Sequence, residues 1–180
     1  MRKIILYSAV TIDGLIARPD GRVDWLDDFS NAPGDEDYGY ADFISSIDTT
    51  VMGHATYRIS LKLGGMPAMA GFTNIVLTRQ KNRAPEDHVT FVSDNIEDVL
   101  NDLRRSDGKN IWLLGGGQVN SFLIQKGLID DMVLTVAPIV LGGGIPLFAQ
   151  PAPSSLFTLK ASRTFPNGLV QSSYTINPTQ

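Results

Sequence analysis

The stretch Ile111-Trp112-Leu113-Leu114-Gly115-Gly116-Gly117-Gln118-Val119 decides the fold of this 180-residue chain. Its apolar first part is typical of a buried strand, and it runs directly into three glycines. Apolar residues at helical spacing then follow, at Val119, Phe122 and Leu123. A strand that passes through glycines into a helix can cradle a phosphate on the backbone N–H groups of the helix N-terminus. The same run is also typical of a plain tight turn.

The spacing of these glycines does not match the Rossmann fingerprint of dinucleotide-binding proteins. After Gly115 and Gly117, the third glycine of that fingerprint would fall where this chain has Asn120. The acidic residue expected at the end of the next strand is missing too, since Asp130 and Asp131 precede that strand. A phosphate bound here therefore requires a different dinucleotide geometry.

Composition indicates one ordinary globular domain over residues 1–180. Apolar residues make up 43% of the chain and charged residues 19%, which argues against disorder. A net charge of −4 argues against nucleic-acid or membrane-surface partners. The chain has no cysteine and two histidines, so thiolate catalysis is excluded and no metal site is expected. No signal-peptide pattern or long apolar run occurs, so we expect a soluble, cytoplasmic protein.

Strand-like and helix-like segments alternate on both sides of the opening stretch. Strands are predicted at 3–10, 50–52, 73–78, 88–92, 110–114, 132–140, 156–163 and 169–176, and helices at 37–46, 53–59, 94–105 and 117–126. This order predicts an α/β fold in which helices cover both faces of a mostly parallel sheet. Pro166-Asn167-Gly168 joins the last two strands and predicts a C-terminal antiparallel hairpin. The irregular stretch from Gly21 to Gly39 is long enough to suggest a functional loop.

Two further strand ends carry polar groups. Val51-Met52-Gly53-His54-Ala55-Thr56-Tyr57 again runs from a strand through a glycine into a helix, where Thr56 either meets a phosphate or simply caps the helix. Val76-Leu77-Thr78-Arg79 ends on an arginine, which either binds a phosphate or is solvated. Ligands of open α/β sheets gather at the carboxyl ends of the strands, so these ends together favour a binding site.

A carboxylate at the start of the helix predicted over 37–46 is the remaining candidate. Asp37 shares one helical face with Tyr40 and Ile44, where a buried carboxylate needs a partner. It is equally typical of a first-turn aspartate that stabilises the helix start. Its neighbours Asp35 and Glu36 leave the choice of acid open.

Taken together, these motifs resemble the dihydrofolate reductase superfamily, and within it the C-terminal reductase domain of the bacterial bifunctional riboflavin-biosynthesis deaminase-reductase. The resemblance spans about residues 3–176 and rests on the order and spacing of several short motifs. They are Ser8-Ala9-Val10-Thr11-Ile12-Asp13-Gly14-Leu15-Ile16-Ala17, Val51–Tyr57, Thr78-Arg79, Leu114–Val119, Leu128–Asp131 and Pro138-Ile139-Val140-Leu141-Gly142-Gly143-Gly144 with Pro146-Leu147-Phe148. The resemblance implies a three-layer α/β/α dihydrofolate reductase-like fold and an NADPH-dependent oxidoreductase.

The resemblance also implies an NADPH site, position by position. Nicotinamide would be bordered by Ala9, Val10 and Ile16, and the pyrophosphate and adenosine ribose by Gly53, His54, Ala55 and Thr56. Adenine and the 2′-phosphate would face Thr78 and Arg79, and Leu114, Gly115, Gly116, Gly117, Gln118 and Val119 would wrap the pyrophosphate. Members of the family typically have a cis peptide bond that corresponds to Gly115–Gly116. Many carry Arg or Lys in place of His54, so Arg79 would have to supply the charge that favours NADPH over NADH.

On the substrate side the resemblance implies a pterin-like or ribitylamino-pyrimidine-like heterocycle. Asp37 is expected to anchor it and supply a proton, Thr135 to donate a hydrogen bond nearby, and Trp25 to act as a lid or stacking residue. The alternatives are a genuine dihydrofolate reductase and a nucleotide-binding protein without catalysis. The strand at 132–140 and the terminal hairpin are candidates for a homodimer interface. The deaminase half of the bifunctional enzyme is excluded, because its zinc motif requires cysteine.

Overall fold

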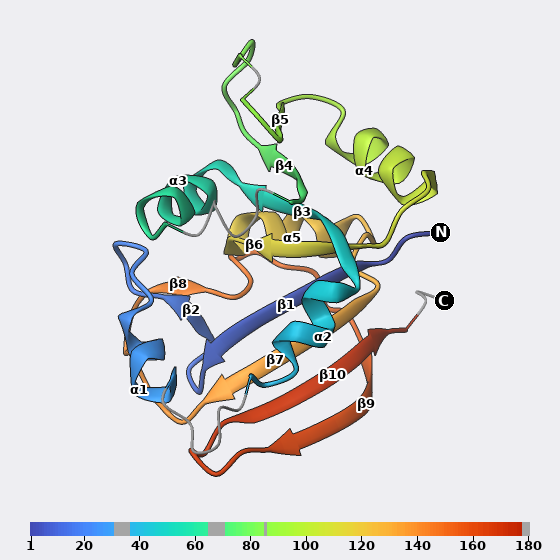
Figure 1. Cartoon of the computed structure of the whole chain (residues 1–180). Helices are drawn as coiled ribbons and strands as arrows, with labels where there is room; N and C mark the ends of the chain where they lie inside the picture. Colours follow the sequence, from blue (N-terminus) through green and yellow to red (C-terminus); the bar gives the residue numbers. More distant parts are fainter. Residues whose placement is uncertain (31–36, 65–70, 85, 178–180) are drawn as a thin grey trace.

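The computed structural model describes residues 1–30, 37–64, 71–84 and 86–177. Its main feature is an eight-stranded sheet with the order β5-β4-β3-β6-β1-β7-β10-β9 (Figure 1). The bounds in that order are Val89–Val92, Thr73–Leu77, Ile47–Gly53, Asn110–Gly115, Ile4–Thr11, Asp131–Ala137, Val170–Ile176 and Phe157–Thr164. The strands from β5 to β7 are parallel, while β10 and β9 pair antiparallel at the C-terminal end of the chain. The predicted α/β fold and terminal hairpin are confirmed.

Helices cover both faces of the sheet. Successive side chains of each parallel strand point to opposite faces, so both faces carry apolar residues that need cover. On one face Leu6, Val51 and Leu113 are fully buried beneath α4 (Ile96–Arg105) and α5 (Gly117–Gln125). On the other face Met52 and Trp112 pack with side chains of α2 (Tyr40–Ser45) and α3 (His54–Lys62). Neighbouring residues such as Val51 and Met52 therefore serve opposite layers, as the period of two in a strand requires. The fold is the predicted three-layer α/β/α sandwich.

Short elements fill stretches in which no regular structure was predicted. Strands β2 (Leu15–Ala17) and β8 (Ile145–Pro146) form a separate antiparallel pair. A 3-10 turn, η1 (Asp24–Leu26), and the helix α1 (Asp27–Ser30) lie in the stretch from Gly21 to Gly39. Segments of two to four residues are too short to show a hydrophobic period, which is why pattern reading missed them.

Two predicted boundaries shift for a clear backbone reason. Strand β7 ends at Ala137 and not at 140, since Pro138 has no N–H to donate to a neighbouring strand. Helix α2 begins at Tyr40 and not at 37, because Tyr38 and Gly39 have φ values of +58° and +76°, which no helical residue adopts. This second shift moves Asp37 off the helix.

Trp25 belongs to the core and is not a lid, so that prediction is wrong. Its side chain is only 1% exposed and packs in a cluster with Ala137, Phe165 and Leu169 beside the terminal hairpin. Asn167-Gly168 makes the turn of that hairpin, with the Phe165 N–H donating to the Leu169 carbonyl at 2.9 Å. The large apolar surface of the Trp25 ring thus packs η1 against the carboxyl end of β7.

We expect Trp25→Ala to lower the free energy of unfolding by about 3–5 kcal/mol, the usual result of truncating a buried aromatic side chain. Trp25→Phe should lower it far less, because the indole Nε1 has no hydrogen-bond partner among the described residues. Urea unfolding followed by circular dichroism measures both variants. A Trp25→Ala protein as stable as the wild type would restore the lid interpretation.

Candidate active site

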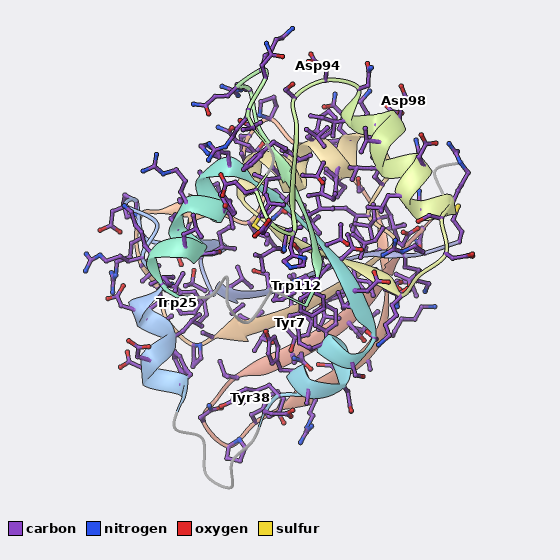
Figure 2. All side chains as sticks on the ribbon, turned by 45° about the horizontal axis from the view of Figure 1, so that its top comes forward. Tyr7, Trp25, Tyr38, Asp94, Asp98 and Trp112 are labelled. Carbon is purple, nitrogen blue, oxygen red and sulfur yellow. The ribbon has the colours of Figure 1, made fainter. Side chains whose placement is uncertain are left out.

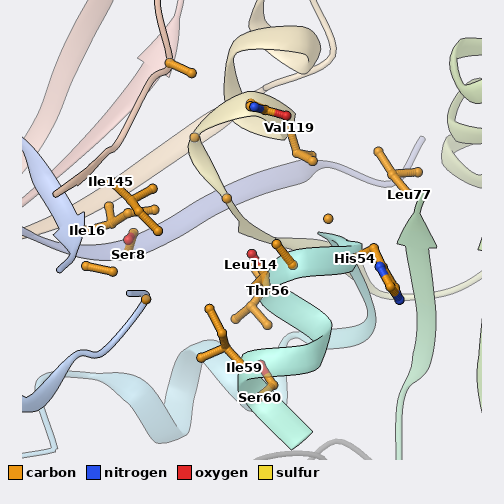
Figure 3. Close-up of a pocket in the computed structure, with 18 of the residues that line it drawn as sticks. Ser8, Ile16, His54, Thr56, Ile59, Ser60, Leu77, Leu114, Val119 and Ile145 are labelled. Atoms are coloured by element: carbon orange, nitrogen blue, oxygen red, sulfur yellow. The ribbon is translucent and has the colours of Figure 1, made fainter. Parts of the chain in front are cut away.

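A cavity of about 1040 Å³ opens at the carboxyl ends of the central parallel strands. Its walls come from the ends of β1, β3, β4 and β6, from the first turns of α3 and α5, and from the β2–β8 pair. Figure 3 shows Ser8, Ile16 and Ile145 at one end of the cavity and His54 and Leu77 at the other, with Thr56 and Leu114 between them. This position is the one at which open α/β sheets bind their ligands.

The junction between β6 and α5 forms the middle of the cavity wall. Gly115 and Gly116 have φ values of +95° and +86°, so two successive residues turn the chain in a region that side chains rarely adopt. A Cβ on Gly117 would lie 2.3 Å from the Pro146 carbonyl oxygen, so only glycine fits there. The N–H groups of the first turn of α5 have no acceptor within the helix, and Gly116, Gly117 and Gln118 line the cavity.

Helix α3 meets the same junction from the other side. The Thr56 hydroxyl donates to the Gly115 carbonyl oxygen at 3.2 Å, so this side chain ties the two helix starts together and does not cap its own helix. A Cβ on Gly53 would lie 3.0 Å from Cγ2 of Val119, which shows how closely β3 approaches α5. Two helix N-termini therefore converge on one part of the cavity, where their dipoles favour an anion.

His54 is joined to an arginine that the sequence analysis did not identify. Its Nε2 accepts a hydrogen bond from the Arg83 guanidinium at 2.6 Å, and Arg83 also donates to Glu86 at 3.0 Å. The Arg83 guanidinium lies 4.2 Å from the centre of the Phe91 ring. Burial, and then the cations Arg83 and Arg58, lower the pKa of His54, so the imidazole is neutral at pH 7.

Arg79 adds a second cation at this end of the cavity. It follows β4 directly, is exposed, and has no ion-pair partner among the described residues. Thr78 beside it is buried, and its hydroxyl accepts a hydrogen bond from the Gln80 N–H at 3.1 Å, which fixes the turn after the strand. This end of the cavity therefore presents the exposed Arg79 guanidinium and the His54 imidazole, which is hydrogen-bonded to the Arg83 guanidinium.

Two aromatic rings, those of Tyr7 on β1 and Trp112 on β6, line the opposite end of the cavity. Tyr7 stacks on Phe43 of α2 with ring centres 4.1 Å apart, and Trp112 lies edge-on to both rings. The Trp112 Nε1 donates to the Tyr7 carbonyl oxygen at 3.1 Å, which locks the indole against β1. Figure 2 shows Tyr7 and Trp112 together in the interior, and both side chains line the cavity. Nothing in the apolar pattern of 3–10 separated Tyr7 from its buried neighbours.

The structure brings most of the predicted cofactor residues into this one cavity. Those that line it are Ala9, Ile16, Gly53, His54, Ala55, Thr56, Thr78, Arg79, Leu114, Gly116, Gly117, Gln118 and Val119. Val10 and Gly115 do not, because Val10 faces the core under α5 and Gly115 is turned toward Asn120.

The three predicted substrate residues lie outside the lining. Thr135 is buried on β7, next to Ala9, and its hydroxyl accepts a hydrogen bond from Gln171 Nε2 at 3.0 Å. Asp37 is exposed and accepts from the Gly39 and Ala41 N–H groups at 2.8 and 3.0 Å, which lowers its pKa. It therefore stabilises the start of α2 as an anion and is not placed to give a proton to a ligand in the cavity. Asp35 and Glu36 lie outside the described residues.

The predicted cis peptide bond between Gly115 and Gly116 is wrong for this structure. The bond is trans, and the cis peptide bond found in the described part of the chain is Gln150–Pro151. Positive φ at both glycines turns the chain here without a cis bond.

The described residues contain no group of three or more His, Cys, Asp or Glu side chains that could hold a metal ion. None of the helices in the same residues is long and apolar enough to cross a membrane.

Fold and cavity together define a protein of the dihydrofolate reductase-like class. Within that class, the model of the RibD C-terminal domain matches residues 2–171, and the chain belongs to this family. The uncharacterized protein YwjB of Bacillus subtilis is 36% identical over 164 residues, which cover 91% of this chain and 92% of YwjB.

Solved structures show the same likeness. A putative riboflavin biosynthesis protein from Shewanella sp. PV-4 superimposes with a TM-score of 0.85 at 29% identity, over 97% of this chain and 99% of its own. Dihydrofolate reductase from Enterococcus faecalis, solved with NADP(H) and RAB-propyl, superimposes with a TM-score of 0.67 over 97% of this chain and 96% of its own. At 20% identity, this second likeness shows a shared fold.

We expect Gly117→Ala to lower the free energy of unfolding by about 1–3 kcal/mol, the usual effect of forcing an extra methyl group into a packed site. The added Cβ would meet the Pro146 carbonyl oxygen, which belongs to the backbone and cannot rotate away. Gly71→Ala is the matched control, since nothing lies within 4 Å of its Cβ position. Urea unfolding compares the two variants. Equal stabilities would show that the backbone at Pro146 in β8 moves away from the added methyl group without cost.

Proposed function

We propose that the chain is an NADPH-dependent reductase that transfers a hydride to a C=N or C=O bond of a pterin-like or ribitylamino-pyrimidine-like heterocycle. The observation that carries the proposal is the cavity of about 1040 Å³, with two glycine-bounded helix N-termini in its middle and the Arg79 and Arg83 guanidiniums at one end. Membership of the RibD C-terminal domain family supports it. The proposal also includes a cytoplasmic location.

The cavity suits an extended dinucleotide. Gly116, Gly117 and the first turns of α3 and α5 offer N–H groups to a pyrophosphate. Arg79 offers charge to a 2′-phosphate beyond the end of β4, and Arg83 adds a second cation behind the neutral His54 imidazole. Ala9 and Ile16 leave room for a flat nicotinamide beside β1. Bound NADPH would supply the hydride, and the apolar walls formed by Ile16 and Ile145 exclude water around the reacting atoms.

Protonation at this site cannot use a carboxylic acid among the described lining residues, since none of them is Asp or Glu. A hydride added to the carbon of a C=N bond requires a proton on the nitrogen. The hydroxyl groups in the described lining at the β1 end are those of Tyr7, Ser8 and Ser60. Burial is the main cause that raises the pKa of Tyr7, so its phenol stays protonated at neutral pH. This favours a reductase of the riboflavin type over a genuine dihydrofolate reductase with an acidic pterin anchor.

Arg83→Ala should weaken NADPH binding by tenfold or more, equivalent to about 1.4 kcal/mol, and leave NADH binding unchanged. The reason is that Arg83 and the imidazole it contacts face the 2′-phosphate, which NADH lacks. Arg79→Ala should act in the same direction. Arg105→Ala is the control, because Arg105 is exposed on α4 and pairs with Asp102. Isothermal titration with both nucleotides measures the effect. Equal losses for NADPH and NADH would contradict this assignment.

The pKa of His54 should rise when NADPH binds and stay low with NADH. Burial and Arg83 now disfavour the imidazolium. A phosphate monoester carries about −1.5 to −2 charge at pH 7 and would favour it. Proton NMR titration follows the change, and His88→Gln assigns the two histidine signals. No difference between the nucleotides would place the 2′-phosphate elsewhere.

The remaining alternative is a nucleotide-binding protein without catalysis. It predicts NADPH binding with the same dependence on Arg83 but no oxidation of NADPH, measured at 340 nm, with pterins or aminopyrimidines. Absence of binding by either nucleotide would overturn both interpretations.

A further inference from the structure

We propose that the ring bound beside NADPH is an uncharged, planar heterocycle without a phosphate group, held on Tyr7 and Trp112, the two rings of the aromatic cluster that line the cavity. This inference rests on the proposed function and names its substrate class. It separates this chain from reductases whose substrate, such as 5-amino-6-(5-phosphoribosylamino)uracil, carries a phosphate.

The charges of the cavity lie at one end. Arg79 follows β4, and the Arg83 guanidinium contacts His54, which follows β3, whereas Tyr7 lies on β1. Strand β4 is separated from β1 by β3 and β6, so three strand spacings of about 4.8 Å place the two ends about 14 Å apart. The charged end is the one that the 2′-phosphate of the cofactor would occupy. A second phosphate, on the substrate, would find no cation left there.

The other end offers apolar and aromatic surface. Besides Tyr7 and Trp112, its described lining comes from the loop after β2 and from the inner side of α3, namely Val23, Leu26, Ile59, Ser60 and Leu63. None of these residues is charged, and the undescribed residues 31–36, 65–70, 85 and 178–180 contain no Lys, Arg or His. A phosphate here would lose water without gaining a counter-charge, which is strongly unfavourable.

The charged groups around the aromatic end do not make it more favourable for a phosphate. Burial is the main cause that raises the pKa of Tyr7, and the Asp37 carboxylate raises it further, so a phosphate beside Tyr7 would meet a negative charge. Arg163 lies over the Phe165 ring at 4.7 Å and acts on Asp37, and it is not part of the lining. Arg58 and Lys62 are on α3 but exposed, outside the residues that line the cavity. Arg18 and Arg22, in the loop after β2, pair with Asp24 and Asp20 and do not line the cavity. The described lining of the aromatic end therefore carries no cation.

The Tyr7 hydroxyl gives this end its specificity for a polar ring. It makes two long contacts, to the Tyr38 carbonyl oxygen at 3.5 Å and from Gln171 Nε2 at 3.4 Å. Gln171 is itself held by shorter hydrogen bonds, to the Tyr38 carbonyl oxygen at 3.1 Å and to Thr135 at 3.0 Å. Because its own contacts are long, the Tyr7 hydroxyl is available to donate to a ring carbonyl or imine nitrogen, while the Gln171 amide beside it stays in place. Gln171 and Thr135 are positioning residues in this arrangement.

The test compares two ligands that differ in the phosphate alone: 5-amino-6-(ribosylamino)uracil and its 5′-phosphate. Each is titrated calorimetrically into the full chain saturated with NADP⁺, which carries the same phosphate groups as NADPH but cannot donate a hydride. We expect the compound without phosphate to bind at least tenfold more tightly. Tighter or equal binding of the phosphate compound, or binding of neither, overturns the inference and leaves the cofactor assignment standing. Failure of NADPH itself to bind overturns the proposed function instead, so the two failures are distinguishable.

A pair of conservative variants tests the role of Tyr7. Tyr7→Phe keeps the stacked ring and removes the hydroxyl, and should weaken binding of the unphosphorylated compound by about tenfold without changing NADPH affinity. Tyr40→Phe is the matched control, because Tyr40 touches the same cluster but does not line the cavity. Equal effects of the two variants would assign Tyr7 a structural role only and overturn its part in the inference.

Discussion

The close approach of α5 to β8 at Gly117 is the constraint on which the cavity depends. The Gly117 carbonyl oxygen accepts from the Ala149 N–H at 3.1 Å, and Asn120 Nδ2 donates to the Leu147 carbonyl oxygen at 2.7 Å. A side chain at position 117 would separate these groups. Because Thr56 binds the other side of the same junction, one backbone contact sets the positions of α3, α5 and the segment after β8. The middle of the cavity is thus built by main chain and glycine, held by the side-chain hydrogen bonds of Thr56 and Asn120.

A second support holds the wall at the β1 end. Asp13, in the turn after β1, accepts hydrogen bonds from the Leu141 and Gly142 N–H groups at 3.2 and 2.9 Å. The Thr11 hydroxyl, and then these backbone donors, lower the pKa of Asp13, so the carboxylate is ionised where it binds. The contact fixes the loop that leads to Gly144 and Ile145, both of which line the cavity. Aspartate in the Thr-x-Asp-Gly motif is therefore explained by anchoring a loop, without a part in the chemistry.

The sequence predicted what depends on repeated local patterns and missed what depends on long-range pairing. Buried parallel strands are apolar runs that end in glycine or polar residues, so the sheet and the strand ends carrying Gly53, Arg79 and Gly117 were readable. Arg83 was not, since it reaches His54 from 29 residues away through a loop without periodicity. Asp37 was misplaced by one turn because positive φ at Tyr38 and Gly39 delays the helix. Trp25 had no partner in the local sequence, and its packing partners come from β7 and the hairpin.

The middle and the aromatic end of the cavity are formed by different parts of the chain. Its middle is set by steric limits at glycines, which admit few alternatives whatever the substrate. Its aromatic end is set by side chains from β1, β6, α3 and the loop after β2, which can change without moving the glycine junction. Binding specificity in proteins generally resides in such side chains and loops carried on a constant scaffold. The chain can therefore keep its fold and its glycine junction while the side chains at the aromatic end change.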